Sequence, residues 1–271
     1  MMSKFKFVHN TTGFNLQNAH SLAMTANLAY QKERDIENTV KKEWKFKDFR
    51  FFSSSEDTQG FVMSNDEIIA VAFRGTEPDK IKDWLTDLDF NLVDGPMEGK
   101  VHDGFYTALG SVWKKIERTI AEFRANKPKS LWFTGHSLGA ALATLAVACF
   151  RDDDRPVDGL YTFGQPRTGD RTFARNFNFE FKPCAFRFVN NNDIVTRTPP
   201  RALKYSHVGT FKYFTEPGEL IHDIAWWNRF LDRMHGRSED ILEWGTDGIK
   251  DHSMESYEKL VKKALSSEKK V

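Results

Sequence analysis

The pattern GHSLG at residues 135–139 constrains this chain more than any other feature. It follows an apolar segment, LWFT at 131–134, and precedes a run of small and apolar residues, AALATLAVA at 140–148. This order predicts a short buried strand, a very tight turn and a helix packed closely against a sheet. Glycines two positions on either side of Ser137 remove the Cβ atoms that would clash in such a turn. The Ser137 hydroxyl would then stand above the sheet at a helix N-terminus, a position typical of a nucleophile.

Length and charge narrow the remaining choices. A chain of 271 residues makes one large domain or two small ones. It has no internal repeat, low-complexity run or clear linker, so we predict a single domain over residues 1–271. Hydrophobic residues make up 40% of the chain, enough for a sizeable core. The net charge of +1 gives no basic excess to favour nucleic acid and no acidic excess to favour a disordered role.

Cysteine content and hydropathy bear on the compartment. The chain has only Cys149 and Cys184, too few for a disulfide framework, and we interpret them as buried free thiols. The N-terminal residues 1–7 carry charge but no apolar core or small-residue cleavage site, so we expect no cleavable signal peptide. The longest apolar stretch, 139–150, is too short to span a bilayer. We therefore expect a soluble protein, cytoplasmic or exported by another route.

Predicted strands and helices alternate along the chain. Segment 68–73, IIAVAF, is wholly apolar, which is typical of a central strand in a sheet covered on both faces. Helices are predicted at 17–30 and 104–123. Further strands are predicted at 46–53, 60–63, 157–163 and 185–190. The alternation indicates an α/β fold with a mainly parallel central sheet and helices on both faces.

Residues 219–248 differ in character from the rest and have the features of a helical insertion before the C-terminal region. Six apolar residues could form one side of an amphipathic helix: Ile221, Ile224, Ala225, Trp227, Phe230 and Leu231. Two interpretations stay open at this point. The helix packs on the edge of the sheet, or its aromatic side faces lipid or a partner.

A serine hydroxyl needs a base to accept its proton and an acid to orient that base. After an elbow of this kind the chain order is nucleophile, acid, histidine. Asp193 follows the apolar segment 185–190 and a polar turn, which places it at the carboxyl end of a predicted strand. An aspartate that only stabilises an Asx-turn is the alternative.

Eight histidines compete for the role of base. His252 comes last and lies on a loop leading into the final predicted helix, where an imidazole could reach back over the sheet. The other seven precede the nucleophile, lie inside the elbow, sit in a turn-like segment or belong to the insertion: His9, His20, His102, His136, His207, His222 and His235. A histidine near a helix start with no catalytic role is the alternative for His252.

Acyl transfer also needs donors for the developing oxyanion. One is the backbone N–H of the residue after the nucleophile, here Leu138. The other should come from the loop after an earlier strand, and Thr76 follows the apolar strand 68–73. Thr76 could offer both its N–H and its hydroxyl; on local sequence it could equally be a threonine that starts a loop.

With these pieces in place, the sequence resembles the class 3 lipases, the fungal-lipase-like branch of the α/β-hydrolases. The resemblance covers roughly residues 18–259. Matched by motif, it implies that Ser137 is the nucleophile, Asp193 the acid and His252 the base, with Thr76 and Leu138 forming the oxyanion hole. Secreted fungal members have signal peptides and disulfides, and we expect neither here. The segments that carry the resemblance, in order, are VAFRGT (71–76), VHDGF (101–105), TGHSLGA (134–140), TFGQPR (162–167), NDIV (192–195), PP (199–200), YSH (205–207) and DHS (251–253).

The segment after the oxyanion loop, residues 77–93, resembles the lid of this family. From Asp79 to Val93, one helical face is apolar and the other is largely polar. We expect a short amphipathic helix that closes the site in water and opens on a lipid surface; a static helix packed on the core is the alternative. The apolar face comprises Ile81, Trp84, Leu85, Leu88 and Leu92, of which Trp84, Leu85 and Leu88 are the predicted substrate and lid residues.

These features together predict a serine carboxylic ester hydrolase, most simply a lipase acting on acylglycerols or other lipid esters at a lipid–water interface through an acyl-serine. Such chemistry needs no metal and no organic cofactor. A phospholipase A1 or an esterase for small or aromatic esters uses the same residues and stays open. A non-catalytic lipase-like binding protein is disfavoured because every expected catalytic position is filled.

Overall fold

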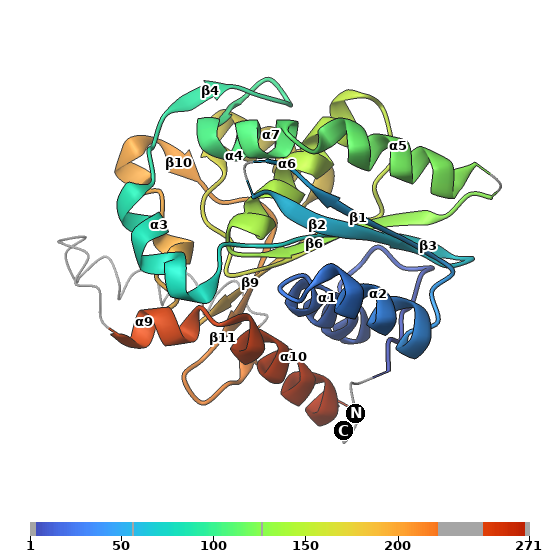
Figure 1. Cartoon of the computed structure of the whole chain (residues 1–271). Coiled ribbons are helices and arrows are strands. Elements are labelled where there is room, and N and C mark those ends of the chain that lie inside the picture. The colour runs from blue at the N-terminus through green and yellow to red at the C-terminus, as the bar shows by residue number, and fades with distance from the viewer. Residues whose placement is uncertain (1–3, 56, 126, 222–245, 269–271) are drawn as a thin grey trace.

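The computed structural model describes residues 4–55, 57–125, 127–221 and 246–268. Its main sheet has eight described strands in the order β1-β2-β3-β6-β7-β9-β11-β12 (Figure 1). Their bounds are Asp48–Ser53, Gln59–Ser64, Ile68–Phe73, Ser130–His136, Gly159–Phe163, Ala185–Asn190, Thr210–Phe214 and Leu220–Ile221. Strands from β3 to β11 in this order run parallel, while β1, β2 and β12 pair antiparallel at the edges. The prediction of a mainly parallel central sheet is confirmed.

Strand β3 shows why this sheet must be covered on both sides. All six of its residues are buried. Ile69 and Val71 pack into one apolar cluster, while Ile68 and Ala70 pack into a second cluster on the opposite face. Side chains alternate across a strand, so a strand without polar residues requires two apolar layers. The prediction made from segment 68–73 is confirmed.

Helices supply both layers (Figure 1). Residues of α4, α5, α6 and α7 pack with Ile69 and Val71, and residues of α1 and α10 pack with Ile68 and Ala70. These helices span Asp103–Gly110, Trp113–Arg124, Leu138–Asp152, Arg171–Phe181, Leu16–Leu28 and Met254–Glu268, in that order. Helix α2, Glu33–Asn38, continues into a π-helical turn at Thr39–Glu43.

One predicted helix is wrong in length. The segment 104–123 forms two helices, α4 and α5, separated at Ser111 and Val112. Gly110 and Ser111 both have low helix propensity, because glycine loses much backbone entropy and serine competes for backbone hydrogen bonds. Here the Ser111 hydroxyl donates to the carbonyl of Ala108 at 2.6 Å. Apolar periodicity continued through this break and concealed it.

Several elements were not predicted from the sequence. Helix α7 and strand β11 belong to the main framework, and a second sheet pairs four short strands in the order β10-β8-β5-β4. The short strands span Tyr205–Ser206, Gly169–Asp170, Lys100–His102 and Leu92–Asp94. Two or three residues carry no usable periodicity, so these strands leave no sequence signal. Helix α7 does leave one, since Phe173, Phe177 and Phe181 recur at four-residue intervals and pack in the core.

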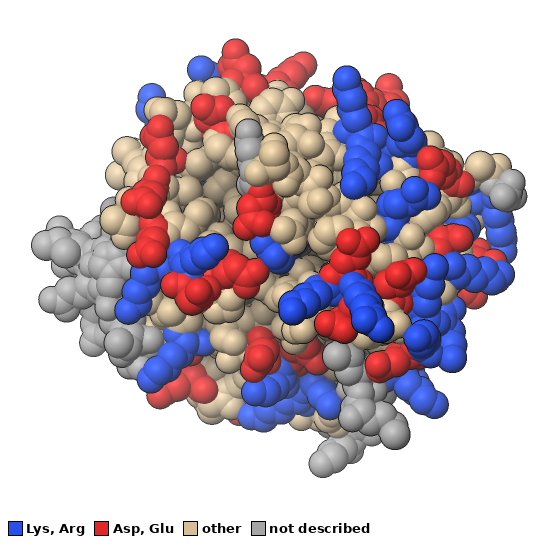
Figure 2. Space-filling view, in the orientation of Figure 1, with Lys and Arg blue, Asp and Glu red and all other residues tan. Residues whose placement is uncertain are grey.

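Most of the predicted insertion, 219–248, lies outside the described residues. Strand β12 and helix α9, Thr246–Asp251, stand at its two ends. The described helices include none that is long and apolar enough to cross a membrane. On the face in Figure 2, lysine and arginine side chains intermingle with aspartate and glutamate, in keeping with the net charge of +1.

Candidate active site

Ser137 sits in a strained turn between β6 and α6. Its φ is +57° and its ψ is −130°, a region that costs free energy for any residue with a Cβ. A Cβ on Gly135 would lie 2.3 Å from the carbonyl oxygen of Gly139, and one on Gly139 would lie 2.3 Å from that of Phe73. Both glycines are therefore required by close backbone approach. The strand, turn and helix predicted around Ser137 are all present.

Asp193 follows β9 and is 1% exposed. Its Oδ1 accepts the backbone N–H of Val195 at 2.9 Å, and its Oδ2 accepts the hydroxyl of Tyr257 at 2.5 Å. Both carboxylate oxygens lie 3.0 Å from Nδ1 of His252. Buried carboxylates require such donors, because an unpaired buried charge is costly. The sequence-predicted acid and base are thus in direct contact.

His252 lies between α9 and α10 and is 3% exposed. Because Asp193 accepts at Nδ1, that nitrogen carries the proton and Nε2 keeps its lone pair. His252 Nε2 and Ser137 Oγ are both buried, and neither has a hydrogen-bond partner among the described residues. The Ser137–His252 hydrogen bond is therefore absent here; such bonds are often long in unliganded enzymes and tighten when substrate binds.

Gly164, just after β7, is the common neighbour of these side chains. Its φ is +57°, and a Cβ there would lie 2.8 Å from Asp193 Oδ2 and 2.9 Å from His252 Nδ1. The preceding residue, Phe163, accepts the backbone N–H of Ser137 at 3.0 Å. The β7 loop thus connects the nucleophile turn to the acid–base pair. The roles of Gly164 and Tyr257 were not predicted, because a glycine's crowding and a contact between distant segments appear only in three dimensions.

The ring nitrogens of His136, the histidine inside the elbow, contact a tyrosine hydroxyl and a backbone carbonyl. Its Nδ1 lies 2.7 Å from the Tyr30 hydroxyl and its Nε2 lies 2.6 Å from the backbone carbonyl of His252.

His102 accepts the N–H of Phe105 at the start of α4, and burial lowers the pKa of His102 to about 4. The pKa of His207 lies well below the usual range, mainly because the ring is buried and secondly because the positive charge of Arg187 is near. His222 and His235 lie outside the described residues.

The two predicted oxyanion-hole residues, Thr76 and Leu138, are each next in the chain to a residue of the same contact, Gly75 against Ser137. Leu138 is the first residue of α6, so its N–H has no acceptor within the helix. Thr76 is half-buried beyond the end of β3, and its hydroxyl has no hydrogen bond with the described part of the chain. Gly75 precedes Thr76, and a Cβ on it would lie 3.0 Å from Ser137 Cβ. The loop after β3 therefore packs directly against the Ser137 turn.

Residues 70–203 match the family model described as Lipase (class 3). The chain belongs to the class 3 lipase family. "Triacylglycerol lipase OBL1" of Arabidopsis thaliana is 29% identical over 247 residues, covering 70% of this chain and 48% of that protein. "Secreted mono- and diacylglycerol lipase 1" of Fusarium solani is 35% identical over 163 residues, covering 58% and 46%. The chain spans about half the length of the curated relatives it matches.

Solved structures agree with this family. Rhizomucor miehei triacylglyceride lipase superposes with a TM-score of 0.66 and 27% identity, covering 75% of this chain and 83% of that one. A second triacylglycerol lipase structure, whose catalytic centre is described as a serine protease triad, gives a TM-score of 0.64 at 27% identity. The fold of this class 3 lipase family member is the α/β-hydrolase fold.

The lid segment, residues 77–93, begins with a 3₁₀ turn at Pro78–Lys80 and forms α3 over Ile81–Asp87. The predicted helix to Val93 is wrong. Leu88 is extended, with ψ at 111°, and Leu92 and Val93 belong to β4, where they pair with β5. Backbone pairing in the second sheet therefore overrides the helical pattern after Asp87.

Helix α3 packs against residues next to Asp193 and His252 in the chain. Its buried Ile81 and Leu85 pack with Ile194 and Val195, which follow Asp193. Ile249, just ahead of His252, contacts the same cluster, as does the half-buried Trp84. The Trp84 ring also stacks on Phe105 at a centroid distance of 6.3 Å. Leu88 is half-buried and packs with the main core instead.

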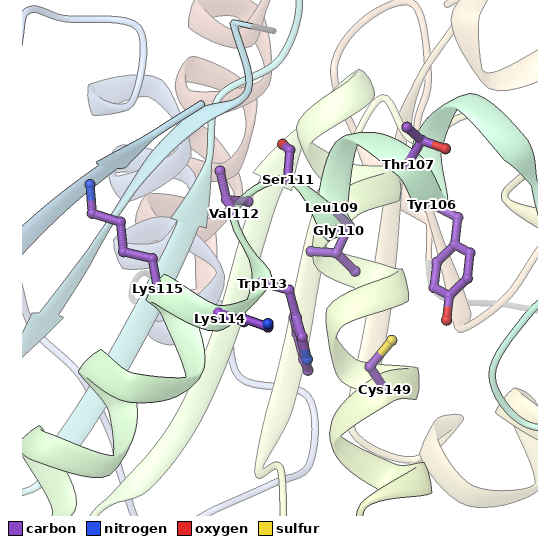
Figure 3. Close-up of a pocket in the computed structure, with 10 residues that line it drawn as sticks. All are labelled: Tyr106, Thr107, Leu109, Gly110, Ser111, Val112, Trp113, Lys114, Lys115 and Cys149. Atoms are coloured by element: carbon purple, nitrogen blue, oxygen red, sulfur yellow. The ribbon is translucent and has the colours of Figure 1, made fainter. Parts of the chain in front are cut away.

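A hollow of about 590 Å³ lies away from these residues, where α4 meets α5 (Figure 3). Trp113, Tyr106 and Cys149 line it, and the triad candidates do not. Cys149 and Cys184 are free and half-buried, not fully buried as predicted. Burial raises the pKa of their thiols to about 12 and about 11, respectively, which makes both poor nucleophiles. The described residues contain no cluster of three His, Cys, Asp or Glu side chains suited to a metal ion.

Proposed function

We propose that this chain is a serine carboxylic ester hydrolase that acts on acylglycerols. One observation carries the proposal: a buried Asp193–His252 pair leaves Nε2 unbonded, and residues 163–164 contact both this pair and a serine in a strained elbow. An aspartate at Nδ1 stabilises the imidazolium that forms when Nε2 accepts a proton. Membership of the class 3 lipase family and the names of its relatives support an ester of glycerol as substrate.

In the proposed mechanism, His252 Nε2 removes the Ser137 hydroxyl proton while Oγ attacks the ester carbonyl carbon. The carbonyl oxygen becomes an oxyanion that accepts hydrogen bonds from the N–H of Leu138 and from Thr76. As the tetrahedral intermediate collapses, His252 gives its proton to the leaving alcohol and an acyl-serine remains. Water, deprotonated by His252, then attacks the acyl carbon, and the fatty acid leaves as Ser137 regains its proton.

We further propose that the lid segment, 77–93, is displaced when the enzyme meets lipid. Ser137, Asp193 and His252 are 0%, 1% and 3% exposed, so a substrate needs an opening that the described residues do not provide. Apolar packing of Ile81 and Leu85 on the Asp193 loop can be exchanged for contact with lipid at little net cost. The proposed partner is therefore a lipid ester at a lipid–water interface.

The single-domain organisation over residues 1–271 also remains our proposal. One continuous main sheet uses strands from Asp48 to Ile221, and helices from both ends of the described chain cover one of its faces.

A labelling experiment and a substrate panel test this function together. A serine-directed phosphonate should modify the enzyme once, and peptide mass spectrometry should place the adduct on Ser137. Emulsified triacylglycerols, phospholipid vesicles and p-nitrophenyl esters should then be compared at equal enzyme concentration. Acylglycerol hydrolysis is expected to dominate. Preferential cleavage of phospholipid at its sn-1 ester would make the enzyme a phospholipase A1, and an adduct on another serine would refute the assigned nucleophile.

A further inference from the structure

The acyl-transfer steps leave two polar side chains near His252 without a role, the buried His136 and the half-buried Tyr30. His136 and Tyr30 are joined by a contact of 2.7 Å between Nδ1 and the hydroxyl. The His136 ring lies against that of His252, with centroids 4.4 Å apart. Its Nε2 lies 2.6 Å from the backbone carbonyl oxygen of His252. A short chain of hydrogen bonds thus leads from Tyr30, two residues after the end of α1, to the backbone of the base.

The partners of His136 determine its tautomer. A carbonyl oxygen can only accept a hydrogen bond, so Nε2 must carry a proton and donate. Nδ1 of a neutral ring then accepts, and the Tyr30 hydroxyl donates to it. Burial raises the pKa of Tyr30, which keeps this hydroxyl protonated. Burial, followed by the neighbouring His252, holds the pKa of His136 well below the usual range and keeps its ring neutral.

The same pair also touches the oxyanion loop. A Cβ on Gly75 would lie 2.4 Å from the Tyr30 hydroxyl oxygen and 2.5 Å from the carbonyl oxygen of His136. It would also lie 3.0 Å from Ser137 Cβ. Gly75 is therefore enclosed between Tyr30 and the elbow, and the hydroxyl of Tyr30 sits where the oxyanion loop meets the nucleophile.

The backbone of His252 is held on both sides of its Cα. Its N–H donates to the carbonyl of Ile249 at 3.2 Å, and its own carbonyl accepts from His136. Asp193 orients the ring at Nδ1. With the backbone and one ring nitrogen fixed, the direction of Nε2 is fixed as well.

We propose that Tyr30 and His136 are a positioning pair for the catalytic base. The neutral His136 ring, oriented by Tyr30, holds the His252 backbone so that Nε2 points to the Ser137 hydroxyl. This inference rests on the proposed function, because it takes His252 as the base. Neither residue of the pair touches the reacting atoms in the mechanism above.

The first test reads the tautomer and does not depend on ester hydrolysis. The full chain is labelled with ¹⁵N-histidine and its long-range ¹H–¹⁵N correlations are recorded at pH 7, with His136→Gln used for assignment. His136 should be neutral and protonated at Nε2. An Nδ1–H tautomer or a protonated ring would overturn the proposal. A failed proposed function would show separately, as a wild-type enzyme that takes no phosphonate at Ser137.

The second test separates positioning from stability. Tyr30→Phe removes only the hydroxyl and should lower kcat by roughly 3- to 10-fold with KM within about two-fold, as expected for one hydrogen bond. His136→Phe keeps a flat ring but loses the donor, and kcat should fall by roughly 10- to 100-fold. His136→Gln places an amide N–H near the position of Nε2 and should recover most of that loss.

Tyr161→Phe is the matched control for Tyr30→Phe. The Tyr161 hydroxyl accepts the backbone N–H of Asn15 at 3.1 Å, and the residue packs in the same cluster without touching the triad. This variant should lower the melting temperature and leave kcat unchanged. Equal kcat losses for His136→Phe and His136→Gln would overturn the proposal. So would a Tyr30→Phe enzyme with wild-type kcat, whether or not either His136 variant folds.

Discussion

Helix α3 packs against Ile194 and Val195, the residues that follow Asp193, yet hydrogen bonds hold the Asp193 carboxylate whereas apolar packing holds α3. The Asp193 carboxylate receives donors from Val195, Tyr257 and His252. Helix α3 packs against the same loop through apolar side chains, the buried Ile81 and Leu85 and the half-buried Trp84. Hydrogen bonds are directional and fix atoms to fractions of an ångström, whereas apolar burial is non-directional and depends mainly on area. Hydrogen bonds thus fix the geometry of the Asp193–His252 pair. The apolar contacts of α3, in contrast, can be replaced by contacts with another apolar surface.

Polar contacts hold the two ends of the lid segment, 77–93, as they hold the triad, whereas apolar packing holds α3. Glu77 pairs with Arg74 at 3.1 Å, and the hydroxyl of Tyr205 donates to the carbonyls of Phe90 and Asn91 at 3.1 and 3.2 Å. The segment is therefore fixed at both ends and held by packing in between. We expect motion to be confined to about residues 78–88.

The largest effect on turnover should come from the triad residues, which depend on directional hydrogen bonds. Ser137→Ala removes the nucleophile, and turnover should fall on the order of 10⁶-fold because the triad acts as a unit. The measurement is initial-rate ester hydrolysis, with circular dichroism to show that the fold is intact. His252→Ala and Asp193→Ala should each be severe, and the double variant should be far from additive. If His222→Ala or His235→Ala is the damaging histidine change and His252→Ala is harmless, the assigned base is wrong.

The second-largest effect on turnover should come from Thr76, in the loop after β3. Thr76→Val keeps the shape and the backbone N–H but removes the hydroxyl, and kcat should fall by roughly 10²- to 10³-fold if that hydroxyl binds the oxyanion. Thr76→Ser retains both donors and should keep most activity. Near-wild-type turnover in the valine variant would confine the oxyanion hole to backbone groups.

A smaller loss is expected where a hydrogen bond supports the acid. Tyr257→Phe removes the donor to Asp193 Oδ2, and hydrogen bonds to charged groups contribute about 1.5–3 kcal/mol. We expect kcat to fall by about 10- to 100-fold with little change in KM. Tyr161→Phe again serves as control, and an unchanged kcat in Tyr257→Phe would mean that the remaining donors suffice.

The smallest effect on hydrolysis should come from substitutions in helix α3. Trp84→Ser removes an aromatic side chain that packs on α3's cluster and on Phe105. Hydrolysis of emulsified long-chain esters should fall about five-fold more than hydrolysis of a soluble short ester, because aromatic side chains contribute strongly to lipid contact. Trp113→Ser, at a half-buried tryptophan that begins α5, should change both rates equally. Equal losses in Trp84→Ser would place Trp84 in a fixed wall of the site.

The elements that sequence predicts well here are those with a strong local cause. The elbow at 135–139 and strand β3 depend on glycine placement and unbroken apolarity, both visible in the letters. The pairing of Asp193 with His252 followed from motif order. The end of α3 at Asp87 did not follow, because β4 pairs with a strand whose position depends on the whole fold. Tyr257 and Gly164 were missed for the same reason: their importance arises from neighbours far away in the chain.

Helix α10 brings Tyr257 to the acid and packs on α1, where Asn27 donates to Glu258 at 2.7 Å. The segment just ahead of it carries His252. The sheet can therefore be complete while the site is still without its base and without a donor to Asp193. Ester hydrolysis would then appear only after this last described helix has docked. In a refolding experiment, recovered activity would lag behind the far-ultraviolet signal of the sheet, and the interval between them would measure the docking of one helix.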